Sequence, residues 1–180
     1  YYPRFSTCVE VTVSAYNQHQ LLDLYDYLKR KVGVNTVFTL LTRGEPRDPA
    51  AKDVDIKKYE EFHRVLEEDN KELAISGYYK MPFSDVLNAK RIVRPRIIAK
   101  TVRENRYQIP CYAGTLGGAM FSKGQVLPCE VRWQDVIGNV RDVDYDFMKL
   151  WNSPQADAYR RDICQNKCFC TYECFLTVNI

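Results

Sequence analysis

The sequence lacks long apolar runs and any strong excess of charge of one sign. No stretch of about 18 or more apolar residues occurs, so we expect no membrane-spanning helix and no membrane partner. Lys and Arg number 26 against 23 Asp and Glu. The resulting net charge of +3 is too balanced to indicate nucleic acid by itself, so a nucleic-acid partner is not expected.

Sequence signals for secretion and for phosphate-binding loops are also missing. The opening residues, YYPRFSTCVEV, do not combine a basic flank, an apolar run and a small-residue cleavage site, so they do not resemble a signal peptide. We therefore expect a cytoplasmic protein. We also expect a piece of a longer chain, because an apolar alternation starts almost at once without an initiating Met. The stretch GTLGG does not precede a helical pattern, so it does not indicate a phosphate-binding loop.

The first 70 residues alternate between strand and helix patterns. Residues 8–15 read as a strand, and the apolar run 35–41 reads as a parallel strand that is buried on both faces. Apolar residues at helical spacing follow the first strand, with Gly33 as the C-cap: Leu21, Leu24 or Tyr25, Leu28 and Val32. A second helical face follows the second strand: Ile56, Tyr59, Phe62 and Leu66. This order predicts an α/β fold, either a small sheet or part of a barrel.

A basic segment over residues 84–106 is predicted to be helical, with a break or kink near Pro95. Its cationic residues are Lys90, Arg91, Arg94, Arg96, Lys100, Arg103 and Arg106. They fit either a phosphate or nucleic-acid surface or a solvated helix face. We favour the solvated face, because no aromatic residues are interleaved as a stacking platform.

The pattern changes after a predicted domain boundary near residue 107. The stretch 119–129 indicates a β-hairpin that turns at Lys123 and Gly124. A short helix is expected within 144–151. Ser153 and Pro154 are suited to the N-cap and first turn of another helix, which runs into Cys164. We therefore expect one domain over residues 1–106 and a second, small α+β domain over residues 107–180.

Cysteine is plentiful in the second part of the chain. The seven cysteines are Cys8, Cys111, Cys129, Cys164, Cys168, Cys170 and Cys174. An odd number argues against a complete disulfide framework, and clustered thiols in a reducing compartment more often bind metal. Iron–sulfur clusters and zinc both take thiolates, but zinc ribbons favour CxxC pairs, which this sequence lacks. Disulfides and unligated thiols remain alternatives. Cys8 begins a strand and is expected to be a core residue.

The spacing of these cysteines resembles a known family. Cys111, the Gly124-x4-Cys129 unit and the run Cys164-x5-Cys170-x3-Cys174 resemble the SPASM or twitch extension of radical SAM enzymes. The stretch GNVRDVDYDFMKLWNSPQADAYRRDI is similar to the linker of that family. The resemblance covers residues 107–180. It extends more weakly to 8–75, which are similar to the later strand–helix units of the partial TIM-like radical SAM barrel.

The resemblance implies one auxiliary 4Fe–4S cluster in this domain. The metal ligands that it implies are Cys111, Cys129, Cys170 and Cys174, with Cys168 as a reserve ligand that could replace Cys170. Cys164 comes last in this order. Two departures favour the shorter, one-cluster twitch version: the family pattern has a cysteine where this chain has Arg161, and no cysteine follows Cys174.

The resemblance also implies radical SAM activity, but the sequence lacks one motif that this activity requires. Radical SAM chemistry needs a CxxxCxxC motif for the cluster that cleaves S-adenosylmethionine, and CQNKCFC is one residue short of it. We therefore expect the motif and that second 4Fe–4S cluster to lie upstream. The complete protein is expected to be an oxidoreductase that acts on a peptide or small-molecule substrate, with ferredoxin or flavodoxin as its reductant. The alternative is a non-enzymatic binding module that zinc or a cluster stabilises.

The ends of the two strands hold the candidate residues for cofactor binding: Asn17, Arg43 and Gly44. In α/β barrels the functional groups gather at the carboxyl ends of strands, and by resemblance these loops approach S-adenosylmethionine. Arg43 could also reach a carboxylate or phosphate of the substrate. A polar turn explains RGEPRDP equally well. We expect His19 and His63 to be ordinary surface or boundary residues, and no catalytic residue is assigned.

Overall fold

The structure, a computed structural model, describes residues 7–71 and 82–180. The chain divides into two compact units, Tyr1–Asn105 and Arg106–Ile180, so the division falls next to the boundary expected near residue 107. Within the described residues, no helix is long and apolar enough to cross a membrane. Each unit has its own small sheet, and the described part of the chain forms no barrel.

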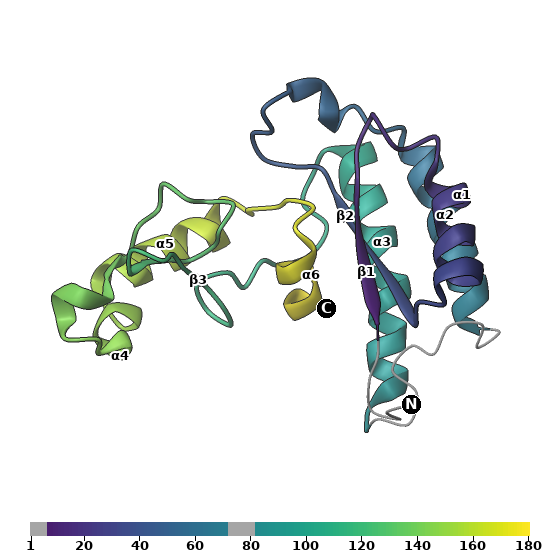
Figure 1. Ribbon diagram of the computed structural model, residues 1–180. Helices are drawn as coiled ribbons and strands as arrows, with labels where there is room; N and C mark the ends of the chain where they lie inside the picture. The colour runs from purple at the N-terminus through teal and green to yellow at the C-terminus, as the bar shows by residue number, and fades with distance from the viewer. Residues whose placement is uncertain (1–6, 72–81) are drawn as a thin grey trace. The chain divides into compact units, whose positions relative to one another are not determined.

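In its described residues, the first unit has two parallel strands and three main helices (Figure 1). Its elements are β1 (Cys8–Val13), α1 (Leu21–Tyr27), a π-helical turn (Leu28–Val32), β2 (Thr36–Leu41), a 3-10 turn (Pro49–Lys52), α2 (Ile56–Lys71) and α3 (Ser84–Glu104). β1 and β2 pair in parallel from Cys8–Thr36 to Val13–Leu41. The predicted strand–helix–strand–helix order is confirmed, and β2 is largely buried as expected.

Side-chain alternation explains why one expectation about β1 is wrong. Val11 and Val13 are buried, whereas Cys8, Glu10 and Thr12 are exposed. Successive strand residues point to opposite faces, so Cys8 lies on the exposed face of β1. Cys8 is therefore not a core residue.

The first helix ends in the way the sequence predicts, although its register changes near the end. The sequence left open whether Leu24 or Tyr25 faces the core. Tyr25 does so at 4% exposure, whereas Leu24 is 37% exposed. The last turn is π-helical, with the N–H of Gly33 donating to the carbonyl of Leu28 at 2.9 Å. A wider turn shifts the helical period, which explains why Val32 is 53% exposed instead of facing the core. Gly33 ends the turn with the left-handed φ of 73°, as a C-cap glycine does.

Helices α2 and α3 pack together beside β2 (Figure 1). Tyr59, Phe62 and Leu66 form the buried face of α2, as predicted. Of the break or kink expected near Pro95, the break is not found, because α3 continues through Pro95 as one helix. A proline removes one backbone hydrogen bond, but the turns on both sides can keep the helix continuous.

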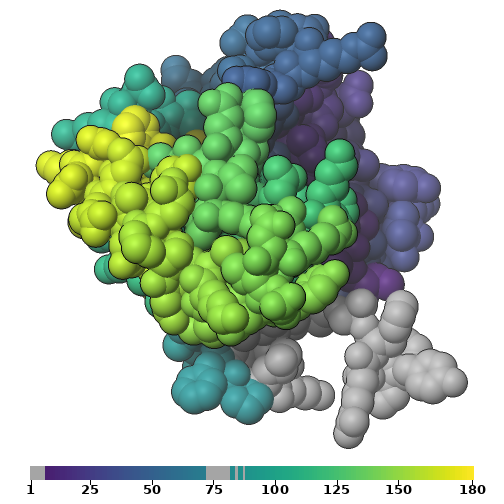
Figure 2. All heavy atoms as spheres, turned by 90° about the vertical axis from the view of Figure 1, so that its left-hand side faces the viewer, coloured from purple at the N-terminus to yellow at the C-terminus, as the bar shows by residue number. Residues whose placement is uncertain are grey.

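The second unit joins a small antiparallel sheet to three short helices. Its elements are β3 (Ala119–Met120), β4 (Gln125–Leu127), β5 (Gly138–Asn139), a 3-10 turn (Val140–Val143), α4 (Phe147–Trp151), α5 (Pro154–Gln165) and α6 (Glu173–Asn179). The strands follow the order β3-β4-β5. Figure 2 draws the atoms of this unit in colours that run from green to yellow.

The local signals of the second unit are confirmed. The hairpin turns at Gly124, which has a φ of 86° and donates its N–H to the carbonyl of Phe121 at 2.8 Å. The Ser153 hydroxyl accepts the N–H of Ala156 at 3.2 Å as the N-cap of α5, and Pro154 occupies the first turn. Beneath the sheet lies a compact apolar cluster made of Val126, Ile137, Val140, Leu150 and Ala156.

Candidate metal centre

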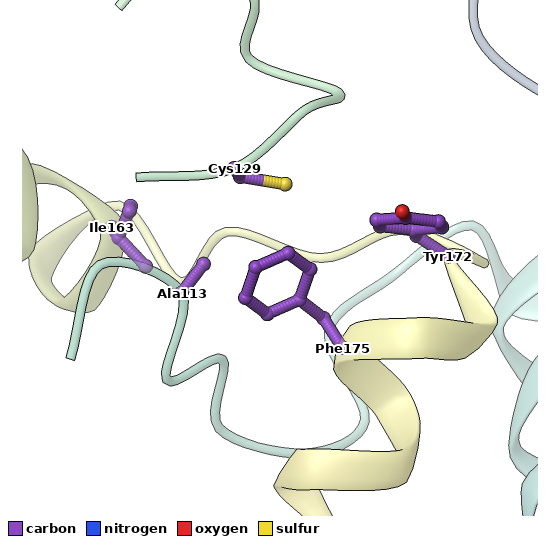
Figure 3. Close-up of a cluster of buried hydrophobic side chains, with 5 residues drawn as sticks. All are labelled: Ala113, Cys129, Ile163, Tyr172 and Phe175. Atoms are coloured by element: carbon purple, nitrogen blue, oxygen red, sulfur yellow. The ribbon is translucent and has the colours of Figure 1, made fainter. Parts of the chain in front are cut away.

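Four cysteines of the second unit gather around one buried cluster. Its core is formed by Ala113, Cys129, Ile163, Tyr172 and Phe175, and Figure 3 shows the Cys129 sulfur pointing toward the side where Tyr172 lies. Three more cysteines pack against this core: Cys111, Cys168 and Cys170. The four cysteines come from three segments: Cys111 near the start of the unit, Cys129 two residues after the end of β4, and Cys168 with Cys170 in the loop between α5 and α6.

Close backbone packing holds the segment after Cys111 in place. The N–H of Gly114 donates to the carbonyl of Gly117 at 2.7 Å, which folds this segment into a tight turn. A Cβ at Gly118 would lie 2.6 Å from the carbonyl oxygen of Leu127, so only glycine fits beside β4. The turn and the strand that leads to Cys129 are thereby kept close together.

Arg160 of α5 fastens the same turn from the other side. Its Nε donates to the carbonyl of Gly114 at 2.6 Å, and its NH2 donates to the carbonyl of Trp151 at 2.6 Å. The guanidinium also lies 5.0 Å from the centroid of the Trp151 ring. One arginine thus connects the cysteine turn to α4 and α5.

Backbone N–H groups point at three of the four sulfurs. The sulfur of Cys170 accepts the N–H of Tyr172 at 3.4 Å. The sulfur of Cys111 accepts the N–H of Ala113. The sulfur of Cys129 accepts the N–H groups of Val131 and Arg132. Such hydrogen bonds stabilise thiolate charge and tune the potential of a bound iron–sulfur cluster.

Three of these thiols, Cys111, Cys129 and Cys168, differ in how readily they lose a proton. A hydrogen bond from the Cys168 thiol lowers the pKa of Cys111 below its usual range, and the same bond raises the pKa of Cys168. Burial, together with the neighbouring thiols Cys170 and Cys111, raises the pKa of Cys129 to about 11. Without a metal, Cys111 therefore carries negative charge more easily than Cys129 or Cys168.

An ion-pair network that the sequence analysis missed lies beside the thiols. Arg132 pairs with Asp135 three residues later and with Asp162 of α5 at 2.6 Å. Its positive charge contributes to the lowered pKa of Cys111 and offsets part of the rise in the pKa of Cys168. The spacing of Arg132 and Asp135 is visible in the sequence. The contact with Asp162 depends on how α5 packs, which no local pattern predicts.

The donor set fits an iron–sulfur cluster in its chemistry. Among the described residues, no group of three or more His, Cys, Asp or Glu side chains could already hold a single metal ion. The ligands of a cluster bind different iron atoms, so they do not have to converge on one point as they do around a single ion. Thiols in one apolar cluster, with backbone N–H groups at their sulfurs, are the surroundings that such a cluster requires.

The grouping differs from the expected ligand set at one position. Cys111, Cys129 and Cys170 come together, and the reserve ligand Cys168 joins them. Cys174 is exposed on α6, where its thiol interacts with the Tyr172 hydroxyl. Cys164 is exposed on α5. The fourth ligand therefore stays a choice between Cys168 and Cys174.

The three candidates for cofactor binding lie at the carboxyl ends of β1 and β2. The Oδ1 atom of Asn17 accepts the N–H of Ser14 at 2.8 Å, and its Nδ2 donates to the carbonyl of Thr12 at 2.7 Å. Gly44 has a left-handed φ of 69°, and its carbonyl accepts Nζ of Lys52 at 3.2 Å. Both residues thus stabilise their own loops. Arg43 directly precedes Gly44, and cofactor binding at this edge stays a prediction.

Comparison with known proteins identifies the second unit. Residues 111–175 match the model of a protein family described as an iron–sulfur cluster-binding domain. That family is SPASM, and the match runs from Cys111 to Phe175, so it includes the six cysteines of the second unit. No curated protein and no solved structure matches the chain. The chain therefore contains a SPASM domain, which implies that it binds an iron–sulfur cluster.

The hydrogen bond between Cys168 and Cys111 predicts an order of thiol reactivity in the metal-free protein. The thiolate is the nucleophile, so at pH 7 iodoacetamide should label Cys111 faster than Cys129. Cys168→Ala removes the donor and raises the pKa of Cys111, so labelling of Cys111 should slow several-fold at pH 7. Mass spectrometry of timed samples measures both rates. Cys164→Ala is the matched control, and equal slowing in the two variants would contradict the assigned hydrogen bond.

Proposed function

We propose that the chain is part of a radical SAM enzyme in which residues 107–180 hold an auxiliary 4Fe–4S cluster. The observation that carries the proposal is the group of four thiols inside the SPASM match, three of them with backbone N–H groups at their sulfurs. The auxiliary cluster, when bound, supplies a site that contacts the substrate or exchanges an electron with it.

In this proposal the residues of the second unit bind the cluster and adjust its electrostatic environment. Cys111, Cys129 and Cys170 are three ligands, and either Cys174 or Cys168 is the fourth. Arg132 supplies nearby positive charge, which favours the deprotonated thiols that binding requires. Burial of Cys129 keeps water away from one side of the site.

The first unit corresponds in the proposal to later strand–helix units of a partial TIM-like barrel. The parallel pairing of β1 and β2 supports this part, since a barrel of that kind is built from parallel strands. Asn17, Arg43 and Gly44 then face the side where S-adenosylmethionine binds. The 180-residue sequence contains no CxxxCxxC motif, so we assign this chain no part in the cleavage of S-adenosylmethionine. A peptide or small molecule is the substrate in this proposal, and ferredoxin or flavodoxin supplies electrons.

Metal analysis of the chain tests the proposal directly. The protein is purified and reconstituted without oxygen, and iron, sulfide and zinc per chain are measured together with the visible absorption spectrum. About four irons with matching sulfide and a brown colour are expected for a thiolate-bound cluster. One zinc and no colour would overturn the proposal and favour a structural zinc-binding module.

A further inference from the structure

The first unit contains a pocket that the cysteine site does not use. It lies between β2, α2 and α3 and has a volume of about 580 Å³. Pockets for small organic ligands commonly span about 300 to 1,000 Å³. All of its lining residues lie between Val37 and Glu104, so the pocket belongs to the first unit alone.

Positive charge dominates the pocket. Six cationic side chains line it: Arg64, Arg91, Arg94, Arg96, Lys100 and Arg103. Among the described residues, three carboxylates face them: Glu60, Glu67 and Glu104. A concave surface with one predominant sign of charge raises the local concentration of ligands of the opposite sign.

Two of the carboxylates fix arginines at the edge of the pocket. Glu67 accepts from NH2 of Arg96 at 2.8 and 2.7 Å, and Glu60 pairs with Arg103. These pairs connect α2 to α3 across the pocket. Arginine side chains that are held in this way lose less conformational freedom when they bind an anion.

Aromatic and aliphatic side chains line the interior of the pocket beside the arginines. The guanidinium of Arg91 lies 5.2 Å from the centroid of the Phe38 ring, and the half-buried Arg94 lies one turn further along α3. Tyr59, Ile92 and Pro95 also line the pocket. Arginines beside ring and aliphatic surface suit a ligand that joins an anionic group to an organic body.

A neutral histidine lies on the α2 side of the pocket. The Nε2 atom of His63 is 2.9 Å from Oγ1 of Thr39. The centroid of the imidazole ring lies 4.3 Å from the centroid of the Tyr59 ring, and the two ring planes are tilted relative to each other. Burial, together with the positive charge of Arg94, lowers the pKa of His63 to about 3. At neutral pH the imidazole therefore offers polar contact without adding charge.

We propose that this pocket binds a small organic phosphate. The planar guanidinium groups of Arg91 and Arg94 match the geometry of phosphate oxygens, and Phe38 with its apolar neighbours receives the organic part of the ligand. The basic helix α3 is therefore not only a solvated face. Arg91 and Arg94 are half-buried at the pocket, whereas Arg96, Lys100 and Arg103 are exposed. The proposal does not depend on the cysteine site or on its cluster.

Calorimetric titration of the full chain at low ionic strength tests this site. The probes are adenosine 5′-monophosphate, pyrophosphate, adenosine and citrate. We expect adenosine monophosphate to bind at least about tenfold more tightly than adenosine, because adenosine lacks the charged group that the arginines recognise. Citrate separates phosphate from carboxylate recognition. Absence of phosphate binding at millimolar concentration, or tighter binding of citrate than of both phosphates, would overturn the proposal.

Variants assign the binding to the pocket. Arg94→Gln should weaken adenosine monophosphate binding by about tenfold or more, since one charge-assisted contact is lost. Arg30→Gln is the matched control, because Arg30 is an exposed arginine of the same unit that pairs with Asp26 outside the pocket. If Arg94→Gln fails to fold by circular dichroism, Lys100→Gln replaces it, with a several-fold loss expected. Equal affinities in the pocket variant and in Arg30→Gln would refute the assignment.

Discussion

A Cys129→Ala variant is expected to lose most of the iron that the reconstituted protein binds, whereas Cys8→Ala is expected to keep it. Cys129 is 5% exposed at the centre of the thiol group, and two backbone N–H groups point at its sulfur. It belongs to the ligand set whether Cys168 or Cys174 completes the site. Cys8 is an exposed residue of the first unit. Iron per chain after anaerobic reconstitution measures the difference.

A folding check and one further variant separate ligand loss from loss of folding. Replacing one buried sulfur with hydrogen costs about 1 kcal/mol of folding free energy, which a folded unit can tolerate. Circular dichroism of the metal-free proteins checks this point. Cys164→Ala removes an exposed thiol from the same unit and should keep the iron. The ligand assignment fails if Cys129→Ala and Cys8→Ala bind the same amount of iron.

Local signals in the sequence predict the elements of the fold well. A left-handed glycine ends the first helix at Gly33, and another turns the hairpin at Gly124. Ser153 followed by Pro154 begins α5, as the capping preference of these residues predicts. Each of these features depends on backbone conformation within a few residues, which side-chain chemistry largely determines. The apolar alternation of β1 also predicts that Cys8 faces away from the core, because Cys8 lies on the opposite face from Val11 and Val13.

Contacts between distant segments are harder to read from the sequence. The spacing of the cysteines indicates a metal site, but the choice of Cys168 over Cys174 as a neighbour of Cys111 depends on the path of the loop between α5 and α6. The contact of Arg160 with Gly114 depends in the same way on how α5 packs. Likewise, the basic pattern of α3 does not tell which arginines point toward α2. Such contacts arise from tertiary packing, which local propensity does not encode.

The stability of the first unit is expected to fall by about 2 kcal/mol between pH 7 and pH 5, because of His63. The pKa of His63 is lowered from 6.5 to about 3 in the folded chain, chiefly by burial and also by Arg94. The unfolded chain therefore binds more protons than the folded chain in this range, and stability falls as the pH decreases from 6.5. Glu67 and Asp69 have lowered pKa values, so their contributions are lost only at more acidic pH.

A His63→Gln variant should keep nearly the same stability at pH 5 as at pH 7, because glutamine does not titrate and can still bond to Thr39. His19→Gln replaces the other histidine, which is exposed, and should lose stability as the wild type does. Urea unfolding followed by circular dichroism gives the stabilities. Both tryptophans, Trp133 and Trp151, lie in the second unit, so tryptophan emission reports that unit alone. A wild-type transition that shifts with pH in circular dichroism but not in tryptophan emission places the effect in the first unit. An equal loss in wild type and His63→Gln would show that another group causes it.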